Sequence, residues 1–131
     1  MKKREILSDH FFRDEFACQG LDCCGHSAPI DAKIIEGLEK FRFLLSKIEG
    51  EEIAVKITSG FRCKKHNEQI GGSKDSYHTK GLAVDIQTKA SVQNMLEAAS
   101  QIRLFKYGGI GIYKNRLHLD LGLMRRWKDL K

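Results

Sequence analysis

Two short segments of this chain alternate apolar and polar residues, which is the pattern of a strand with one buried face. The first reads LAVDIQ over residues 82–87 and the second reads LHLDLG over residues 117–122. Successive side chains of a strand point to opposite faces of its sheet, so the aliphatic residues of each segment share one face. The other face carries Asp85 in the first segment and His118 and Asp120 in the second. If the two strands pair, these three polar side chains converge on one side while the aliphatic residues build a core on the other.

A long helix is predicted before these strands. Apolar residues recur at three- and four-residue steps from Ile34 to Ile48, which is the stripe of an amphipathic helix. Pro29 and Asp31 open the pattern and Gly50 closes it.

Shorter elements complete the expected fold. Ser91 is placed to cap a second helix, and Ser8 or Asp9 is placed to cap a short helix near the N-terminus. The remaining predicted elements are a strand over 53–58, a short helix over 63–70, and two strands, 108–114 and 116–122, joined by a tight turn at Lys114-Asn115. This order predicts an α+β fold, with helices packed on one face of a small antiparallel sheet.

Length and charge limit what such a fold can do. The 131 residues fit a single domain over 1–131, and the formal net charge is +6. The basic excess is spread thinly, which suits either an anionic partner or ordinary solubility. Nucleic acid is not an expected partner, because the basic residues are not interleaved with aromatic ones. No segment has the apolar length of a signal peptide or a membrane span, so we expect cytoplasmic synthesis without a signal peptide.

A metal site is one interpretation of the polar strand faces. His78 lies seven residues before Asp85, and Gly81 between them can turn the imidazole back over the strand. Two histidines and one carboxylate are a usual ligand set for catalytic zinc, with a fourth position left for water. Such an ion supports amide hydrolysis. The ordinary alternative, that these are solvated or satisfied side chains without a ligand, stays open from the residues alone.

The same residues resemble a known family. SYHTKGLAVDI, residues 76–86, resembles the S-x-H-x-x-G-x-A-x-D motif of the zinc D-alanyl-D-alanine carboxypeptidases, peptidoglycan peptidases related in fold to the hedgehog signalling domain. LHLDLGLMRRW, residues 117–127, resembles the late H-x-D segment of that family. ITSGFRCKKHNEQIGGS, residues 57–73, is similar to the strand, arginine and short helix that precede the metal motif. LSDHFFRDEFAC, residues 7–18, resembles the opening of short members, many of them phage-associated.

The resemblance implies a role for each matched residue. His78, Asp85 and His118 would be the ligands of one catalytic zinc ion. Arg62 would stabilise the oxyanion or hold a substrate carboxylate, both of which suit a planar, permanently charged guanidinium. Ser76 would hydrogen-bond the substrate or brace its loop.

The general base is where this chain departs from the family. Several members carry an acidic residue three positions before the last histidine, and that position is Asn115 here. Asp120 is the nearest carboxylate, and we expect it to be the base, with the orientation of a ligand as its other possible role. If Asp120 only orients, another acid such as Asp75 would act.

The implied function is a zinc-dependent peptidoglycan peptidase, either a D-alanyl-D-alanine carboxypeptidase or an endopeptidase, acting on peptidoglycan peptides. The alternative is a zinc-binding cell-wall interaction module with weak or no catalysis. Because no signal peptide is expected, release to the wall during phage lysis, as with an endolysin, is the expected route.

The cysteines carry no clear signal for a second metal. They are Cys18, Cys23, Cys24 and Cys63, and the first three fall within CQGLDCCGH. Their spacing differs from the paired C-x-x-C pattern of common zinc ribbons. We expect a structural role, with Cys63 packed near Cys18 or Cys23.

Overall fold

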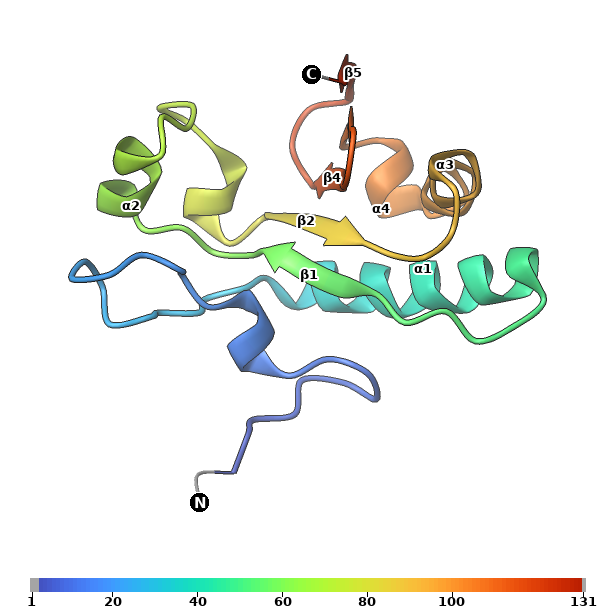
Figure 1. Cartoon of the computed structure of the whole chain (residues 1–131), viewed down its shortest axis with the longest axis horizontal. Helices are drawn as coiled ribbons and strands as arrows, with labels where there is room; N and C mark the ends of the chain where they lie inside the picture. The colour runs from blue at the N-terminus through green and yellow to red at the C-terminus, as the bar shows by residue number, and fades with distance from the viewer. Residues whose placement is uncertain (1–2, 131) are drawn as a thin grey trace.

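A computed structural model describes residues 3–130. The helices are η1 (Arg13–Phe16), α1 (Ala32–Glu49), α2 (Lys64–Gln69), η2 (Tyr77–Lys80), α3 (Val92–Ser100) and α4 (Arg103–Lys106), where η denotes a 3-10 helix. The strands are β1 (Lys56–Ser59), β2 (Ala83–Gln87), β3 (Gly109–Tyr113), β4 (Leu117–Asp120) and β5 (Arg125–Asp129). In Figure 1 the N-terminal segment and β5 lie on opposite sides of β1 and β2. Within the described part of the chain, no helix is both long and apolar enough to cross a bilayer.

The five strands form one sheet in the order β1-β2-β4-β3-β5. The β1–β2, β2–β4 and β4–β3 pairs are antiparallel, as predicted, and helices cover the apolar face of the sheet. The predicted α+β class is therefore confirmed. The sheet is mixed, however, because β5 joins β3 in parallel. The sequence of β5, RRWKD, has no alternating apolar residues and gives no signal of a strand.

The two longer helices begin and end where their capping residues predict. Asp31 accepts a hydrogen bond from the Lys33 amide at the start of α1, and Gly50 ends the helix with a left-handed φ of 75°. The Ser91 hydroxyl accepts from the Asn94 amide at the start of α3.

The predicted N-terminal helix cap is wrong. Ser8 and Asp9 lie in a turn, and the 3-10 helix begins only after Phe12. The Ser8 hydroxyl donates to Glu39 on α1 at 2.5 Å and so ties the N-terminal segment to that helix.

The strand predicted over 53–58 is shorter and begins later, at Lys56. Lys56 pairs with Gln87, the last residue of β2, so the preceding residues run beyond the partner strand and have no ladder to join. Ile53, Val55 and Ile57 are nevertheless buried together, as their alternation predicts.

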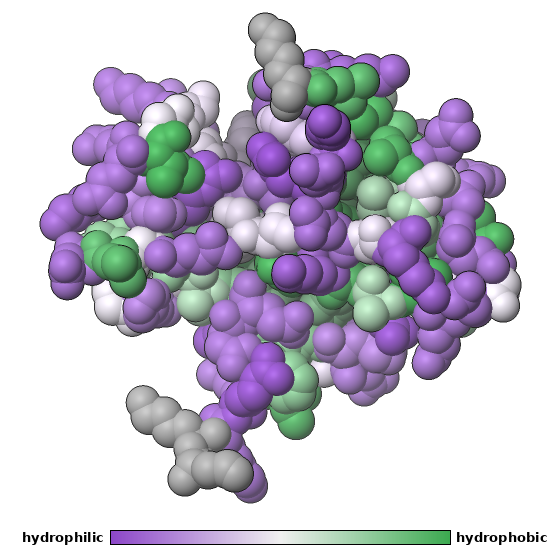
Figure 2. Space-filling view, in the orientation of Figure 1, coloured by the Kyte–Doolittle hydropathy of each residue, from purple (hydrophilic) through white to green (hydrophobic). Residues whose placement is uncertain are grey.

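The core lies on one face of the sheet and the polar residues of the predicted site lie on the other. Ile34, Leu38, Phe41 and Leu45 of α1 are fully buried in the core. The sheet contributes Val84 and Ile86 from β2, Ile110 from β3, and Leu117 and Leu119 from β4. Figure 2, in the orientation of Figure 1, shows a mostly hydrophilic surface with apolar groups scattered across it.

Candidate metal centre

Strand pairing brings the two halves of the predicted site together. In the β2–β4 ladder Asp85 is directly opposite His118, and Ala83 is opposite Asp120. The Nδ1 atom of His118 lies 2.9 Å from Oδ1 of Asp85. The pairing of these two strands, on which the predicted convergence depended, is confirmed.

His78 reaches the same point from η2. Ser76 caps this 3-10 helix by accepting a hydrogen bond from the His78 amide at 3.2 Å. Gly81 ends it with a φ of 68°, and an added Cβ there would lie 2.7 Å from the carbonyl oxygen of Pro29. The turn therefore requires glycine, as the position of Gly81 before the strand suggested.

The main chain fixes the orientation of the His78 ring. Its Nδ1–H donates to the carbonyl of Gly60 at 2.8 Å, which leaves Nε2 as the unprotonated nitrogen of the neutral ring. Nε2 lies 3.3 Å from Oδ1 of Asp85. It is buried and has no hydrogen-bond partner. A buried acceptor without a partner is unfavourable unless a ligand fills its lone pair, so this atom fits a metal ligand.

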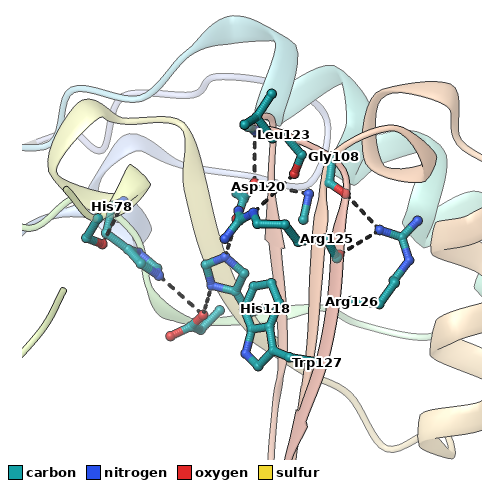
Figure 3. A network of polar contacts seen from close by, with 12 residues as sticks. His78, Gly108, His118, Asp120, Leu123, Arg125, Arg126 and Trp127 are labelled. Atoms are coloured by element: carbon teal, nitrogen blue, oxygen red, sulfur yellow. Dashed lines mark hydrogen bonds and ion pairs between the residues drawn. The ribbon is translucent and has the colours of Figure 1, made fainter.

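His78, Asp85 and His118 thus form a compact donor set. One ligand atom from each residue lies within 4.8 Å of the others, and all three residues are largely buried. Figure 3 shows the imidazoles of His78 and His118 turned toward one another, with Asp120 and Arg125 beyond His118. Two imidazoles and one carboxylate match the ligands that zinc prefers in open, catalytic sites. The donor set therefore fits the ion that the sequence predicted.

The charges of this donor set are coupled. Burial opposes ionisation of Asp85, but its contacts with His118 and His78 hold the pKa of its carboxyl well below the usual range. Burial also favours the neutral His118 ring, yet hydrogen bonds to Asp120 and Asp85 outweigh burial and raise its pKa.

Asp120 is fully buried, and both of its oxygens are engaged. Oδ1 accepts from the Gly109 amide at 3.0 Å and from the Gly122 amide at 2.9 Å. Oδ2 accepts from Nε2 of His118 at 2.7 Å and from Arg125 at 2.5 Å. Burial opposes its ionisation, but these bonds lower the pKa of Asp120 to about 2.

Arg62 lies beside the donor set, as predicted. Its guanidinium is 3.8 Å from Oδ2 of Asp85, and Asn67 and Ser59 hold it there at 3.0 and 3.4 Å. Burial lowers the pKa of Arg62, with Asp85 acting in the opposite direction.

Arg116 is a residue of this site that the sequence analysis missed. Its Nε lies 3.6 Å from Oδ2 of Asp85, and its guanidinium stacks 4.1 Å from the centre of the Tyr113 ring. The signal was present, because Arg116, His118 and Asp120 alternate along one strand face.

The strand β3 makes room on the polar face of the sheet. Gly109 and Gly111 lie opposite Asp120 and His118 in the ladder. A Cβ on Gly109 would lie 2.4 Å from Oδ2 of Asp120, and one on Gly111 would lie 2.3 Å from the Trp127 indole. The indole in turn packs 5.1 Å from the His118 ring.

The donor set lies in a cleft of ≈ 570 Å³. Arginines and aromatic rings dominate the cleft wall, together with the loop that precedes η2. Besides the three donors, the residues that line it include Arg62, Arg116, Arg125, Tyr77, Tyr113, Trp127, Asp75, Ser76 and Asp120. Of these acids, Asp75 is exposed, whereas Asp85 and Asp120 are buried.

A buried histidine–aspartate–histidine set beside a cationic cleft, on the polar face of an α+β sheet, could hold a metal ion. The chain belongs to the peptidase M15 family, whose model matches residues 9–120. This match confirms the family resemblance found in the motifs and makes the protein a member of a peptidase family.

The relatives carry a more specific description. The chain is 32% identical over 127 residues to the peptidoglycan L,D-endopeptidase MepK of Escherichia coli strain K12, a match that covers 91% of this chain and 62% of the relative. The MepK protein of Shigella flexneri matches equally well. A probable peptidoglycan L,D-endopeptidase MepK of Haemophilus influenzae is 29% identical over 99 residues, which cover 70% of this chain and 52% of that protein. The chain spans about three-fifths of the length of the E. coli relative it matches.

Proposed function

We propose that this protein is a zinc-dependent peptidase that cleaves an L,D-peptide bond in peptidoglycan. The observation that carries the proposal is the set of His78, Asp85 and His118, whose ligand atoms lie within 4.8 Å of one another in the wall of a cleft. The peptidase family and the naming of the MepK relatives as L,D-endopeptidases support the substrate. Carboxypeptidase action, the other expected activity, is the alternative outcome of the test below.

His78, Asp85 and His118 would hold the ion. When bound, zinc in such a site supplies an activated water molecule and polarises the scissile carbonyl. The Gly60 carbonyl keeps the Nε2 lone pair of His78 directed at the site, and Asp120 fixes the His118 ring through its Nε2–H. These two contacts pre-organise the ligands, so that little reorganisation accompanies binding.

The arginines of the cleft would bind the substrate. Peptidoglycan peptides carry carboxylates, and guanidinium groups pair with carboxylates in a planar, two-pronged geometry. Arg62 is braced by Asn67 and only 15% of its side chain is exposed, which suits a fixed contact near the scissile bond. Arg116 is 42% exposed and suits a contact further out.

We propose that Asp120 positions His118 and that it is not the general base. A base needs a free lone pair within reach of the attacking water, and both oxygens of Asp120 already accept hydrogen bonds. Asp75, the exposed acid of the cleft, is the better candidate for the proton acceptor.

One observation favours the second candidate function, a zinc-binding wall module without catalysis. Asn115 replaces the acid that several family members carry, and Asp85 and Asp120 are both held in contacts of their own. For either candidate function, release of the protein to the wall during phage lysis remains a prediction from the sequence.

The test is digestion of purified cross-linked peptidoglycan, followed by mass spectrometry of the fragments. The proposal expects zinc-dependent loss of cross-linked dimers, abolished by a chelator and restored by zinc. Asp85→Asn should remove the activity, whereas Asp9→Asn, a matched change outside the cleft, should keep it. Removal of terminal alanine without loss of dimers would make the protein a carboxypeptidase. Zinc binding without any product would support the wall module.

A further inference from the structure

Four cysteine sulfur atoms meet at a second point of the molecule. Cys18, Cys23 and Cys24 come from the loop after η1, and Cys63 is the residue that precedes α2. All four Sγ atoms lie within 4.8 Å of one another. We call these residues the tetracysteine cluster. The expected proximity of Cys63 to Cys18 is confirmed, at 3.9 Å between their Sγ atoms.

The spacing of the sulfur atoms matches a tetrahedral thiolate site. The Cys18–Cys23, Cys18–Cys63 and Cys23–Cys24 pairs are each separated by 3.9 Å. A disulfide requires a separation of about 2.05 Å, and all four thiols are free. Four sulfur atoms placed tetrahedrally around zinc at about 2.3 Å lie about 3.8 Å from each other.

The surrounding backbone is shaped around the cluster. The His66 amide donates a hydrogen bond to Sγ of Cys63 at 3.4 Å. Gly20 passes so close that an added Cβ would lie 2.7 Å from Sγ of Cys23 and 2.8 Å from Nδ1 of His66. Asp22 and His26 both take positive φ values, 55° and 59°, which a non-glycine residue adopts at a cost.

The loop that carries three of the cysteines is held by hydrogen bonds but has no apolar core of its own. Residues 17–28 contain no regular helix or strand, and Leu21, their one large aliphatic residue, is 76% exposed. Cys18 is the buried apolar side chain of this loop. A metal cross-link would reduce the conformational freedom of a loop that has two non-glycine residues at positive φ and no core of its own.

We propose that Cys18, Cys23, Cys24 and Cys63 bind a second zinc ion in a closed, structural site. Four thiolates leave no open position for water or substrate, so this ion would stabilise the fold and take no part in hydrolysis. It would join the N-terminal loop to the residue that follows Arg62. The Arg62 amide also donates to the His78 carbonyl at 3.1 Å, so the second site would anchor the backbone at the edge of the catalytic cleft.

Cobalt substitution separates the two sites by their ligands. Protein purified under reducing conditions, stripped of metal and reloaded with Co²⁺, should bind two equivalents and show the intense near-ultraviolet charge-transfer band of thiolate ligation. His78→Ala should bind one equivalent and keep the band. Cys23→Ser/Cys24→Ser should lose the band and keep one equivalent. His26→Asn, beside the cluster but outside the donor set, should behave like the wild type.

A second measurement covers the case in which the cysteine variants do not fold. In His78→Ala, only the cysteine site can hold metal, so zinc should raise the thermal midpoint, and a thiol-specific mercurial should release one zinc ion per chain. Absence of the thiolate band in reduced, cobalt-loaded wild type would overturn the proposal. The proposal would also be overturned if protein purified under reducing conditions had a mass that shows disulfide bonds between these cysteines and no bound zinc. Neither result would alter the test of peptidase activity, which depends on the histidine site.

Discussion

At the level of single residues, the candidate catalytic site is a chain of orienting contacts. Gly60 fixes the His78 ring, and Asp120 fixes the His118 ring from the side away from Asp85. Each histidine therefore presents one defined nitrogen to the same carboxylate oxygen. Contacts behind metal ligands commonly govern affinity as strongly as the geometry of the ligands themselves.

We predict that Asp120→Asn weakens zinc binding. Asparagine keeps the size of the side chain but loses the charge. Its NH2 group would also face N–H donors that now donate to Asp120, so those hydrogen bonds would be lost. Loss of such a partner lowers metal affinity by about 10–100-fold. Competition with a chromophoric chelator measures the change.

Asp75→Asn is the matched comparison, because it removes the charge of an exposed acid in the same cleft. It should leave zinc affinity unchanged and lower kcat. If Asp120→Asn kept its zinc affinity and lost only kcat, Asp120 would be the base, as the sequence first suggested.

At the level of elements, glycines in β3 leave room for the side chains of the site. The strand β3 carries Ile110 on the core face and glycine on the site face, and the Trp127 ring occupies the space above Gly111. The late strand β5 thereby becomes part of the cleft wall.

We predict that Gly111→Ala displaces the Trp127 indole. The added methyl group would lie 2.3 Å from the ring, so either the indole or β5 must move. Overpacking of this kind costs about 1–3 kcal/mol in the free energy of unfolding. Urea denaturation followed by tryptophan fluorescence measures both effects.

A double-mutant cycle with Trp127→Phe supplies the control. The smaller ring should recover part of the cost of Gly111→Ala. Purely additive effects of the two changes would show that the ring and the methyl group do not meet.

The attachment of the N-terminal segment to α1 should depend on pH. Burial opposes ionisation of Glu39, but hydrogen bonds from Ser8 and His10 lower its pKa. A carboxyl with a depressed folded-state pKa stabilises the protein above its unfolded value of about 4.3, and this contribution is lost as the pH falls through the folded value. Glu39→Gln should therefore be destabilised near pH 7 and differ less from the wild type near pH 3.

Urea denaturation at the two pH values measures this difference. The control is Glu36→Gln on the same helix, because Glu36 forms an exposed ion pair with Lys40. An exposed pair of this kind should contribute no more than about 1 kcal/mol to the free energy of unfolding. Equal losses in the two variants at pH 7 would contradict a specific role for Glu39.

At the level of the whole molecule, the sheet separates the residues of the hydrophobic core from those of the candidate metal site. Its apolar face packs against α1 and α3, while its polar face holds the donor set. Leu38→Ala in the core should cost about 2–5 kcal/mol in the free energy of unfolding. Zinc affinity, measured well below the unfolding transition, should stay unchanged. A loss of affinity in the folded variant would show that core packing and site geometry are coupled.

The sequence predicts those parts of the fold in which apolar residues recur at regular spacing. Alternation in β2 and β4 predicts which side chains share the polar face, and the pairing of the two strands then places Asp85 beside His118. It does not predict β5, whose strand conformation comes from backbone pairing with β3 in place of an apolar face. The proximity of Cys63 to Cys18 was expected, but the meeting of all four sulfur atoms was not, because their spacing C-x4-C-C does not match a common metal motif. The role of Asp120 was ambiguous because sequence cannot show how many donors surround a carboxylate.

The contact that aims His78 has one further consequence. Its partner is the peptide oxygen of Gly60, which every amino acid at that position would also possess. No replacement of a side chain can delete this acceptor, but a replacement at Gly60 would move it, because an added Cβ would lie 2.6 Å from the Cα atom of Phe16. A substitution at Gly60, or a change in chain length between Ser59 and Cys63, would therefore displace the acceptor and redirect the ring. The direction in which His78 faces the donor set is thus set by how closely the main chain at Gly60 packs against Phe16.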